Sequence, residues 1–446
     1  MSESIASGNG DGSVTSASAS RRPELPPEQR VVVTGLGTVC GWGEGIEALW
    51  QGLLGAGTAI RPFRRFDTAR YRTQLAAEVP GELGNGGIPA RNNGHAAHAR
   101  LSLADRFALA AADEALVQAG LQPRADTGAA GVFFGSSTGG MWESERYYAH
   151  LIGSAPGRAH LGWITSQQYN GPGDAVARWS GAGGPVETLS SACTSGALAI
   201  AAAADALREG EAELAIAGGS DSLCQLTYAG FNSLRAVDAG PCLPFRRERE
   251  GMSLGEGAAV LVLETLARAR RRGAQPLAEL LAGASSCDAH HMTAPAPDGR
   301  GAVAAIQRAL DEAGIAPDDV DFVNAHGTGT PLNDAAEWQA LLATLGPRAA
   351  AVPVAAPKGS VGHLLGAAGA LEAVATILCL SRGCVHPTPP GGSVDEAAPA
   401  RLVLGPPVRD ERLRVGLSIN LAFGGSNAAL LFERWDQTPH GGAPCP

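Results

Sequence analysis

The residue best placed to act as a nucleophile is Cys193, at the centre of the segment ETLSSACTSG at 187–196. A short β-branched run precedes it and small apolar residues follow, which predicts a strand that ends before the cysteine and a helix that begins after it. Backbone N–H groups and the dipole at a helix N-terminus favour a thiolate and lower its pKa, and they can hold a developing oxyanion. The alternative is a buried structural cysteine, which we expect of the other seven.

Two histidines lie in glycine-rich turns: His326 in NAHGTGTP and His363 in KGSVGHLLGAAG. Each turn follows a predicted strand and precedes a predicted helix, so both imidazoles should point to one shared face of an α/β protein. Lys358, the only lysine of the chain, lies five residues before His363. Glu372 falls inside the apolar helix that His363 begins, and a carboxylate there needs a partner, for which Lys358 is the natural candidate. A structural role is the alternative for a lone histidine, but the pair beside a lysine favours chemistry.

Two other short motifs suggest different chemistry. Gly35-Leu36-Gly37 resembles a dinucleotide-binding loop, but the third glycine falls at Gly41, one residue too late, so a tight strand-to-helix turn is the better interpretation. GSSTG at 135–139 follows a strand and matches the G-x-S-x-G elbow of hydrolases. A serine hydrolase that uses Ser137 is therefore a rival hypothesis.

The elements that must position these residues alternate along the chain, which predicts an α/β architecture with buried sheets. Strands are predicted at 31–35, 130–135, 185–190, 213–218, 258–263, 320–324, 351–355 and 414–419. Helices are predicted at 44–54, 103–119, 194–208, 302–313, 334–344 and 364–381. The helix at 194–208 has no charge before Asp205, and a helix that is apolar all round should be buried on every side, between sheets.

Composition excludes several classes of protein. The net charge of −10 over 446 residues, without a run of Lys and Arg, argues against a nucleic-acid partner. Neither apolar stretch predicts a membrane span, because 194–204 is short and 364–380 contains Glu372. The N-terminus lacks a signal pattern and the eight cysteines show no C-x-x-C spacing, so we expect a cytoplasmic protein without a zinc site or disulfides. Residues 1–29 and 437–446 should be disordered tails.

From Val31 to about Trp435 the chain resembles the elongating β-ketoacyl–acyl carrier protein synthases, including ketosynthase subunits of dissociated type II polyketide systems. The ordered motifs that carry the resemblance are VVVTGLG, SSACTSG, PFRREREGMSLGEGAAVLVLE, DAHHMT, NAHGTGTP, KGSVGHLLGAAG and AFGGSN. The resemblance implies a thiolase fold: a five-layered αβαβα sandwich of two similar halves, here 30–275 and 276–436, normally in a dimer.

The resemblance also implies roles for individual residues. Cys193, His326 and His363 match the family's catalytic triad, and Lys358 matches its network lysine with Glu372 nearby. The remaining matches are Thr328 and Thr330, which would contact the pantetheine arm; Phe423, which would gate the nucleophile; and Thr138, which would help to close the acyl pocket. The family's oxyanion hole is implied at the backbone N–H groups of Cys193 and Phe423.

Three positions depart from the family pattern. Gly359 replaces a Ser or Ala, Ala422 replaces a glycine and stiffens the backbone beside Phe423, and Thr138 is smaller and more polar than the usual aliphatic residue. None of these changes touches the triad. Together they favour a specialised polyketide or polyene pathway, with housekeeping fatty acid elongation as the alternative.

The reaction implied is decarboxylative condensation of an acyl-enzyme with malonyl-acyl carrier protein, with no metal and no bound cofactor. The phosphopantetheine arm would arrive on the carrier protein. A non-catalytic chain-length partner shares the fold but typically lacks the cysteine, and a thiolase needs a second cysteine in a C-x-G setting, which neither Cys384 nor Cys445 has. The second subunit of the dimer would be another copy or a chain-length-factor-like paralogue.

Overall fold

The computed structural model describes residues 25–84, 101–153 and 156–435. The predicted disordered tails lie largely outside this range, at 1–24 and 436–446. Residues 25–29 of the predicted N-terminal tail are described. The Pro27 carbonyl accepts a hydrogen bond of 3.0 Å from the backbone N–H of Ala267, and the Arg30 carbonyl one of 2.8 Å from that of Leu266. These bonds tie the start of the chain to a neighbouring helix.

Five strands of the first half follow one another across the central sheet, and the short β2 (Gly43–Glu44) pairs with β1 (Val31–Cys40) beside them. The order across the sheet is β1, β8 (Gly257–Thr265), β7 (Leu214–Asp221), β5 (Gly131–Gly135) and β6 (Val186–Leu189). The first two pairings are antiparallel and the last two are parallel. β6 therefore lies at an edge.

The second half repeats this arrangement. Its strands lie in the order β9 (Ala278–Cys287), β15 (Ser426–Arg434), β14 (Val415–Leu421), β10 (Phe322–Asn324) and β11 (Val354–Ala355). Again two antiparallel pairings precede two parallel ones, in the same chain order. β1 and β9 pair over three residues and join the two sets into one continuous sheet. The two similar halves that the sequence predicted are thus visible in the topology.

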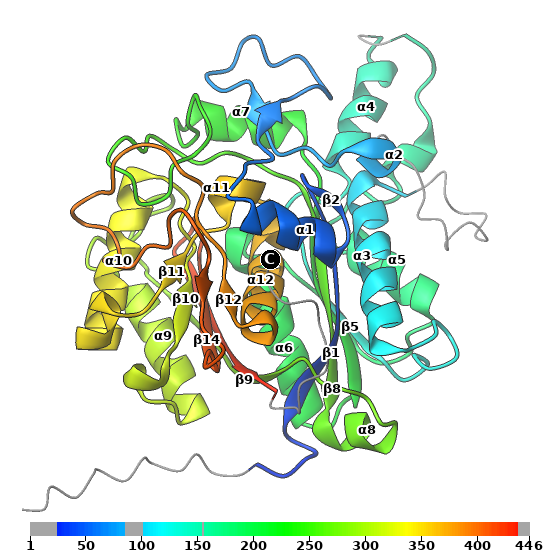
Figure 1. Cartoon of the computed structure of the whole chain (residues 1–446). Coiled ribbons are helices and arrows are strands. Elements are labelled where there is room, and N and C mark those ends of the chain that lie inside the picture. Colours follow the sequence, from blue (N-terminus) through cyan, green and yellow to red (C-terminus); the bar gives the residue numbers. More distant parts are fainter. Residues whose placement is uncertain (1–24, 85–100, 154–155, 436–446) are drawn as a thin grey trace, which may run out of the picture.

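The two sets of strands form two layers, and helices between them and outside them complete five layers (Figure 1). The inner helices α6 (Ser195–Arg208) and α12 (Ala368–Arg382) contact each other and strands of both halves. The outer layers are formed on one side by α3 (Leu103–Ala119) and α5 (Gly171–Ser180), and on the other by α9 (Arg300–Ala313) and α10 (Pro331–Leu345). The predicted five-layered thiolase fold is confirmed.

Shorter elements connect these layers. The helices are α1 (Ile46–Leu54), α2 (Gly81–Gly84), α4 (Met141–Leu151), α7 (Gln225–Ser233), α8 (Leu266–Arg271) and α11 (Lys358–Val361), with 3-10 turns η3 (Leu161–Ile164), η4 (Ala192–Thr194), η5 (Pro317–Asp319), η6 (Gly346–Ala350) and η7 (Leu365–Ala367). The short strands are β2 (Gly43–Glu44), β3 (Arg61–Pro62), β4 (Leu75–Ala76), β12 (Cys384–Val385) and β13 (Val408–Arg409). Every predicted strand and helix overlaps an observed one, whereas β9, β15, α4, α5, α7 and α8 were not predicted.

Two expectations need correction. Gly35 and Gly37 lie inside β1 and not in a turn, because α3 crosses the strand there: an added Cβ would lie 2.1 Å from the Ala115 carbonyl oxygen at Gly35 and 1.9 Å from that of Ala111 at Gly37. Residues Leu365–Arg382 do have the length and mean hydropathy, 1.4, of a membrane-crossing helix. However, 89% of that segment is buried inside the protein.

Candidate active site

Cys193 lies in the 3-10 turn η4, which leads directly into the inner helix α6. Ala192 before it adopts φ 48°, a conformation that side chains other than glycine rarely take, so the turn is sharp. The Ser195 hydroxyl donates to the Ala192 carbonyl at 2.6 Å and accepts from the Ser191 N–H at 2.8 Å. These bonds hold the turn, and the thiol projects from the helix N-terminus as the sequence predicted.

Glycines let the two inner helices meet at this point. An added Cβ at Gly196 would lie 2.9 Å from the backbone nitrogen of Ala370, and one at Gly369 would lie 2.8 Å from that of Ala197. Only glycine permits such an approach. The N-terminus of α12, just beyond His363, is therefore brought against the N-terminus of α6, just beyond Cys193.

His363 is fully buried and its backbone is held by the first half of the chain, since its N–H donates to the Ser253 carbonyl at 2.7 Å. Its ring Nδ1 accepts a hydrogen bond of 3.0 Å from the backbone N–H of Leu365. Because Nδ1 is an acceptor, the ring proton lies on Nε2. Nε2 is buried and has no partner among the described residues, so it is a donor available to a ligand.

His326 follows β10. As for His363, hydrogen bonds hold both its backbone and its ring, but they come from other residues. Its backbone N–H donates to Glu337 of α10 at 2.6 Å, and the N–H of Gly327 donates to the same carboxylate at 2.8 Å. The Lys358 ammonium lies 2.9 Å from the ring Nδ1 of His326 and 2.6 Å from the His326 carbonyl oxygen. The ammonium can only donate, so Nδ1 accepts and the proton of this ring also lies on Nε2.

Lys358 forms the predicted ion pair with Glu372, and both side chains are buried. The second carboxylate oxygen of Glu372 accepts from the Asn420 side chain. Lys358 lies five residues before His363 in the sequence, but its ring contact is with His326. The reason is that α11 follows β11, which pairs directly with β10, the strand that ends just before His326.

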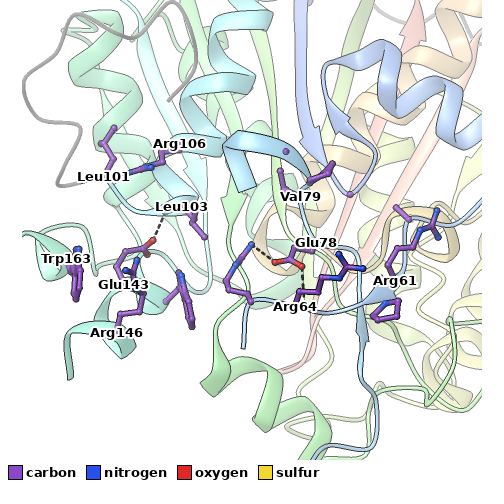
Figure 2. Close-up of a pocket in the computed structure, with 17 residues that line it drawn as sticks. Arg61, Arg64, Glu78, Val79, Leu101, Leu103, Arg106, Glu143, Arg146 and Trp163 are labelled. Atoms are coloured by element: carbon purple, nitrogen blue, oxygen red, sulfur yellow. Dashed lines mark hydrogen bonds and ion pairs between the residues drawn. The ribbon is translucent and has the colours of Figure 1, made fainter. Parts of the chain in front are cut away.

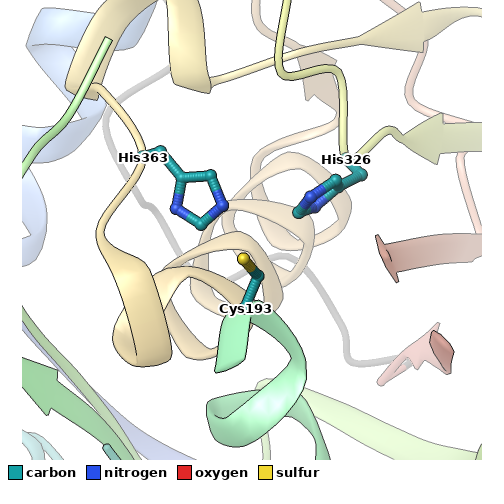
Figure 3. A group of neighbouring side chains, drawn as sticks. All are labelled: Cys193, His326 and His363. Atoms are coloured by element: carbon teal, nitrogen blue, oxygen red, sulfur yellow. The ribbon is translucent and has the colours of Figure 1, made fainter. Parts of the chain in front are cut away.

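The two imidazoles face the sulfur from the same side (Figure 3). Their centroids lie 5.5 Å apart with the rings at 88° to each other, and the sulfur and one nitrogen of each ring all lie within 4.8 Å of one another. Thiolate and imidazole are also zinc ligands, so these three side chains are the residues that could hold a metal ion. Burial, and then the charge of Lys358, hold the pKa of both histidines well below its usual range. Both rings are thus neutral donors near pH 7.

The pKa of Cys193 differs from the expectation. Burial raises it to about 11, although the charge of Lys358 and the backbone N–H groups of Phe423 and Cys193 act to lower it. The helix N-terminus does not outweigh desolvation, because Cys193 is only 6% exposed. The resting enzyme therefore holds a thiol. The two N–H groups at the sulfur are the predicted oxyanion donors.

The triad opens into a cavity of about 340 Å³. Thr328 and Thr330 line it, with their hydroxyl oxygens 3.0 Å apart, and so do Phe423 and Ala422. The Phe423 ring packs against Phe231 with centroids 5.7 Å apart. The structure thus brings the predicted pantetheine contacts and the predicted gate to one cavity, and their roles stay predictions.

Thr138 differs from the other predicted substrate contacts, Thr328, Thr330 and Phe423, because it does not line this cavity. Its hydroxyl lies 2.9 Å from Asp221 and 3.1 Å from the Ser222 carbonyl oxygen. Ser137, the nucleophile of the rival hypothesis, donates its hydroxyl to Asp221 at 2.7 Å and accepts from the Gly366 N–H at 3.1 Å. Within the described residues neither bond involves a histidine, so the geometry of a serine hydrolase is not formed.

A larger cavity of about 780 Å³ lies elsewhere, beside α4 and the segment at 61–65 (Figure 2). On its wall Arg65 forms ion pairs with Glu78 and Glu256, and Arg146 lies 4.5 Å from the centre of the Trp163 ring. None of the predicted site residues lines it.

Sequence reasoning missed Glu337, Asn420 and Asp221. All three are polar, are less than 1% exposed, and hold backbone or side chains of the site. A signal for Glu337 was available, because it is an acidic residue on the buried face of a predicted helix. The contacts of the other two depend on how distant strands meet.

Comparisons with known proteins agree with this geometry. The family described as "Beta-ketoacyl synthase, N-terminal domain" matches residues 28–269, and "Beta-ketoacyl synthase, C-terminal domain" matches residues 277–391. The chain is 33% identical to 3-oxoacyl-[acyl-carrier-protein] synthase I of Hordeum vulgare, covering 94% of this chain and 92% of the relative. It is 34% identical to 3-oxoacyl-[acyl-carrier-protein] synthase 2 of Staphylococcus aureus, covering 92% and 100%.

Solved structures show the same likeness. The ishigamide ketosynthase/chain length factor superposes with a TM-score of 0.83 at 32% identity, covering 91% of this chain and 99% of that chain. A type II polyketide synthase acyl carrier protein in complex with its ketosynthase, bound to the hexaketide, gives 0.81 at 27%, with the same coverage. The fold and these relatives thus define a thiolase-fold acyltransferase. The chain belongs to the β-ketoacyl synthase family.

Proposed function

We propose that the protein condenses an acyl group held on Cys193 with a malonyl group carried by acyl carrier protein, releasing carbon dioxide. The observation that carries the proposal is the pair of ring Nε2–H donors, on His326 and His363, fixed beside one thiol in a shared cavity. Such donors suit an enolate oxygen, which exists only after decarboxylation.

The first step loads the enzyme. The sulfur of Cys193 attacks the carbonyl carbon of an acyl thioester, the bond to the pantetheine sulfur breaks, and the proton of the Cys193 thiol passes to the departing pantetheine thiol. The tetrahedral oxyanion is held by the N–H groups of Cys193 and Phe423, which already lie at the sulfur. Lys358 adds a positive charge that favours the transient thiolate.

The second step forms the carbon–carbon bond. Malonyl thioester loses carbon dioxide to give an enolate, whose oxygen accepts hydrogen bonds from the Nε2–H groups of His326 and His363. The enolate carbon attacks the acyl carbonyl on Cys193, and the tetrahedral intermediate expels the sulfur. One proton is taken up, so the products are β-ketoacyl-carrier protein, carbon dioxide and the free thiol.

The partner that delivers both acyl groups is proposed to be acyl carrier protein, with its phosphopantetheine arm in the cavity. The cavity mouth carries Leu234 and Leu332, which are 57% and 63% exposed, beside Arg235. An apolar rim with a cation suits a partner whose docking surface is apolar and acidic. The likeness to a ketosynthase in complex with its carrier protein supports this partner. No other cofactor is required by the chemistry.

We place the reaction in a specialised polyketide or polyene pathway. Two features support this: the likeness to the ishigamide ketosynthase/chain length factor, and Ala422 in the cavity wall beside Phe423. Thr138, which also entered the expectation, no longer supports it, because its hydroxyl faces Asp221. Housekeeping elongation is the second candidate, favoured by the relatives from Hordeum vulgare and Staphylococcus aureus.

A dimer across the edge strand β6 is proposed, in the reducing environment of the cytoplasm, where Cys193 stays a thiol. β6 pairs only with β5 within the described residues, and its outer edge is open to a second strand. Two exposed apolar side chains lie at this edge: Val186 in the strand itself, and Tyr169, which lines a pocket together with Thr188 of the strand. The second subunit can be another copy or a chain-length-factor-like paralogue. Light scattering of the purified chain distinguishes the two, because only self-pairing doubles the mass.

The reaction is tested with purified protein, acyl-carrier protein and malonyl-carrier protein labelled in the free carboxylate. We expect labelled carbon dioxide and a β-ketoacyl product two carbons longer than the acyl substrate. Acyl transfer to water, with no carbon dioxide, would contradict the proposal. An inert monomer that becomes active only with a paralogue would support the heterodimer.

A further inference from the structure

A buried carboxylate next to the site has no role in the reaction described above. Asp221 ends β7 and is fully buried, and the structure shows no cation paired with it within the described residues. Seven N–H and O–H donors surround it instead. They are the backbone N–H groups of Ser137, Thr138, Gly139 and Gly366, at 2.9, 2.8, 3.3 and 2.6 Å, and the hydroxyls of Ser136, Ser137 and Thr138, at 2.7, 2.7 and 2.9 Å.

The bond to Gly366 links Asp221 to the catalytic histidine. Gly366 and Leu365 are neighbours in the turn η7, and their consecutive N–H groups point to different acceptors: Gly366 to Asp221, and Leu365 to Nδ1 of His363 at 3.0 Å. Leu365 has φ 54°, a conformation that needs support from its surroundings. No larger residue would fit in place of Gly366 at this contact, because an added Cβ there would lie 2.7 Å from the Asp221 carboxylate.

We propose that Asp221 is a positioning residue for His363, acting through the turn at Leu365 and Gly366, with Thr138 and Ser137 completing the anchor. The carboxylate holds the strained turn, the turn presents the Leu365 N–H to Nδ1, and this N–H keeps the His363 proton on Nε2. The segment at 136–139 is then a cradle for this carboxylate and not a hydrolase elbow. The catalytic part of this inference rests on the proposed function, whereas the structural part does not.

The test combines the nitrogen spectrum of the imidazoles with kinetics, on the full chain labelled with ¹⁵N-histidine. In Asp221→Asn an amide replaces an acceptor that faces only donors, so the turn should relax. We expect the His363 resonances to move towards a mixture of tautomers, while those of His326, held by Lys358, stay in place. The kcat of condensation should fall by about 10- to 100-fold, as for a displacement of about 1 Å, with the KM for acyl-carrier protein unchanged.

Thr138→Val, which removes one donor with little change of shape, should move the His363 resonances in the same direction by less, and Thr138→Ser should match the wild type. If Asp221→Asn does not fold, Thr138→Val and Ser137→Ala decide the question. Unchanged His363 resonances in every folded variant would overturn the proposal. Shifted resonances in a protein whose wild type does not condense would refute the proposed function alone and leave the positioning role intact.

Discussion

The two halves of the molecule build the same turn and use it differently. In the first half, SSACTSG at 190–196 runs through η4 into α6; in the second, HLLGAAG at 363–369 runs through η7 into α12. The first residue of each turn has positive φ, 48° at Ala192 and 54° at Leu365, and each segment ends in a glycine that contacts the other helix. Cys193 of one turn therefore corresponds to Gly366 of the other.

The difference lies in what each turn presents. The first turn presents a thiol and free N–H groups, which suits a nucleophile and an oxyanion. In the second turn a glycine N–H is used for anchoring, and the residue that faces the site is His363, three positions earlier. The second half also carries the buried groups Lys358, Glu337 and Glu372, which fix His326. In the proposed reaction, the first half thus supplies the group that holds the acyl chain, and the second half supplies the groups that stabilise the enolate.

Removing the thiol that the first turn presents should have the largest effect on condensation. Cys193→Ala should lower kcat for condensation by about 10⁴-fold or more, as for other nucleophiles that act within a unit. Cys287→Ala is the matched control, because Cys287 is exposed and lies outside the triad. Steady-state kinetics with mass analysis of the acyl-enzyme measures both. Small alkylating reagents should also modify Cys287, so a substrate-like inhibitor is needed to label Cys193 alone. Retained acylation in Cys193→Ala would contradict the assignment.

Breaking the buried pair of the second half should have the next largest effect. Lys358→Ala leaves Glu372 without its cation, which should lower the free energy of unfolding by about 3–5 kcal/mol. Lys358→Ala with Glu372→Gln should recover part of this stability while condensation stays poor, because the donor to Nδ1 of His326 is missing. Urea denaturation followed by circular dichroism measures the stability. A double variant no more stable than the single one would refute the pairing.

The neutral histidines of the second half should make the free energy of unfolding depend on pH. The pKa of His363 is lowered well below 6.5 by burial, so below pH 6.5 the unfolded chain takes up a proton that the folded one does not. Its contribution to stability is therefore complete above pH 6.5 and is lost as the pH falls, at up to about 1.4 kcal/mol per pH unit. Glu337 and Glu372, whose pKa burial raises to about 8 and about 7, act in the opposite direction.

The difference between wild type and His363→Gln isolates this contribution. Urea unfolding at pH 7.5, 6.5 and 5.5 should show the two proteins converging as the pH falls below 6.5. A constant difference across this range would show that His363 takes up its proton in the folded protein.

The smallest effect should come from the loop at Ala422 and Phe423. With this loop the second half places the Phe423 N–H at the Cys193 thiol of the first half. Ala422→Gly should lower the free energy of unfolding by about 0.4–1 kcal/mol through added backbone freedom. In a polyene pathway the wild type is expected to prefer unsaturated over saturated acyl chains. Ala422→Gly should reduce this preference, a selectivity worth about 1–3 kcal/mol at most. Competition between the two substrates, with products separated by mass, measures the ratio. Thr138→Val should slow both chains equally, since Thr138 does not line the cavity. Equal rates in the wild type would favour ordinary fatty acid synthesis.

The sequence predicted much of the site because its chemistry lies in short local motifs. Cys193, His326 and His363 could be identified from their turns, and the Lys358–Glu372 pair from a carboxylate within an apolar helix. The inner helix at 194–208 was predicted by its lack of charge.

What escaped prediction depends on distant segments. Lys358 reaches His326 because β11 pairs with β10, and Thr138 faces Asp221 because β5 pairs with β7. The raised pKa of Cys193 follows from burial by elements of both halves, which outweighs the helix N-terminus. Gly35 and Gly37 belong to a strand because α3 packs on it, a contact that the local pattern does not show.

The central claim is that the first half holds the acyl group and the second half stabilises the enolate. The most direct test is to measure acyl transfer to Cys193 separately from carbon dioxide release in His326→Ala and His363→Ala. Loading is followed by the mass of the acyl-enzyme, and decarboxylation by release of labelled carbon dioxide from malonyl-carrier protein. The account predicts that each variant loads at close to the wild-type rate and releases carbon dioxide at least about 100-fold more slowly. Equal losses in both steps would contradict it.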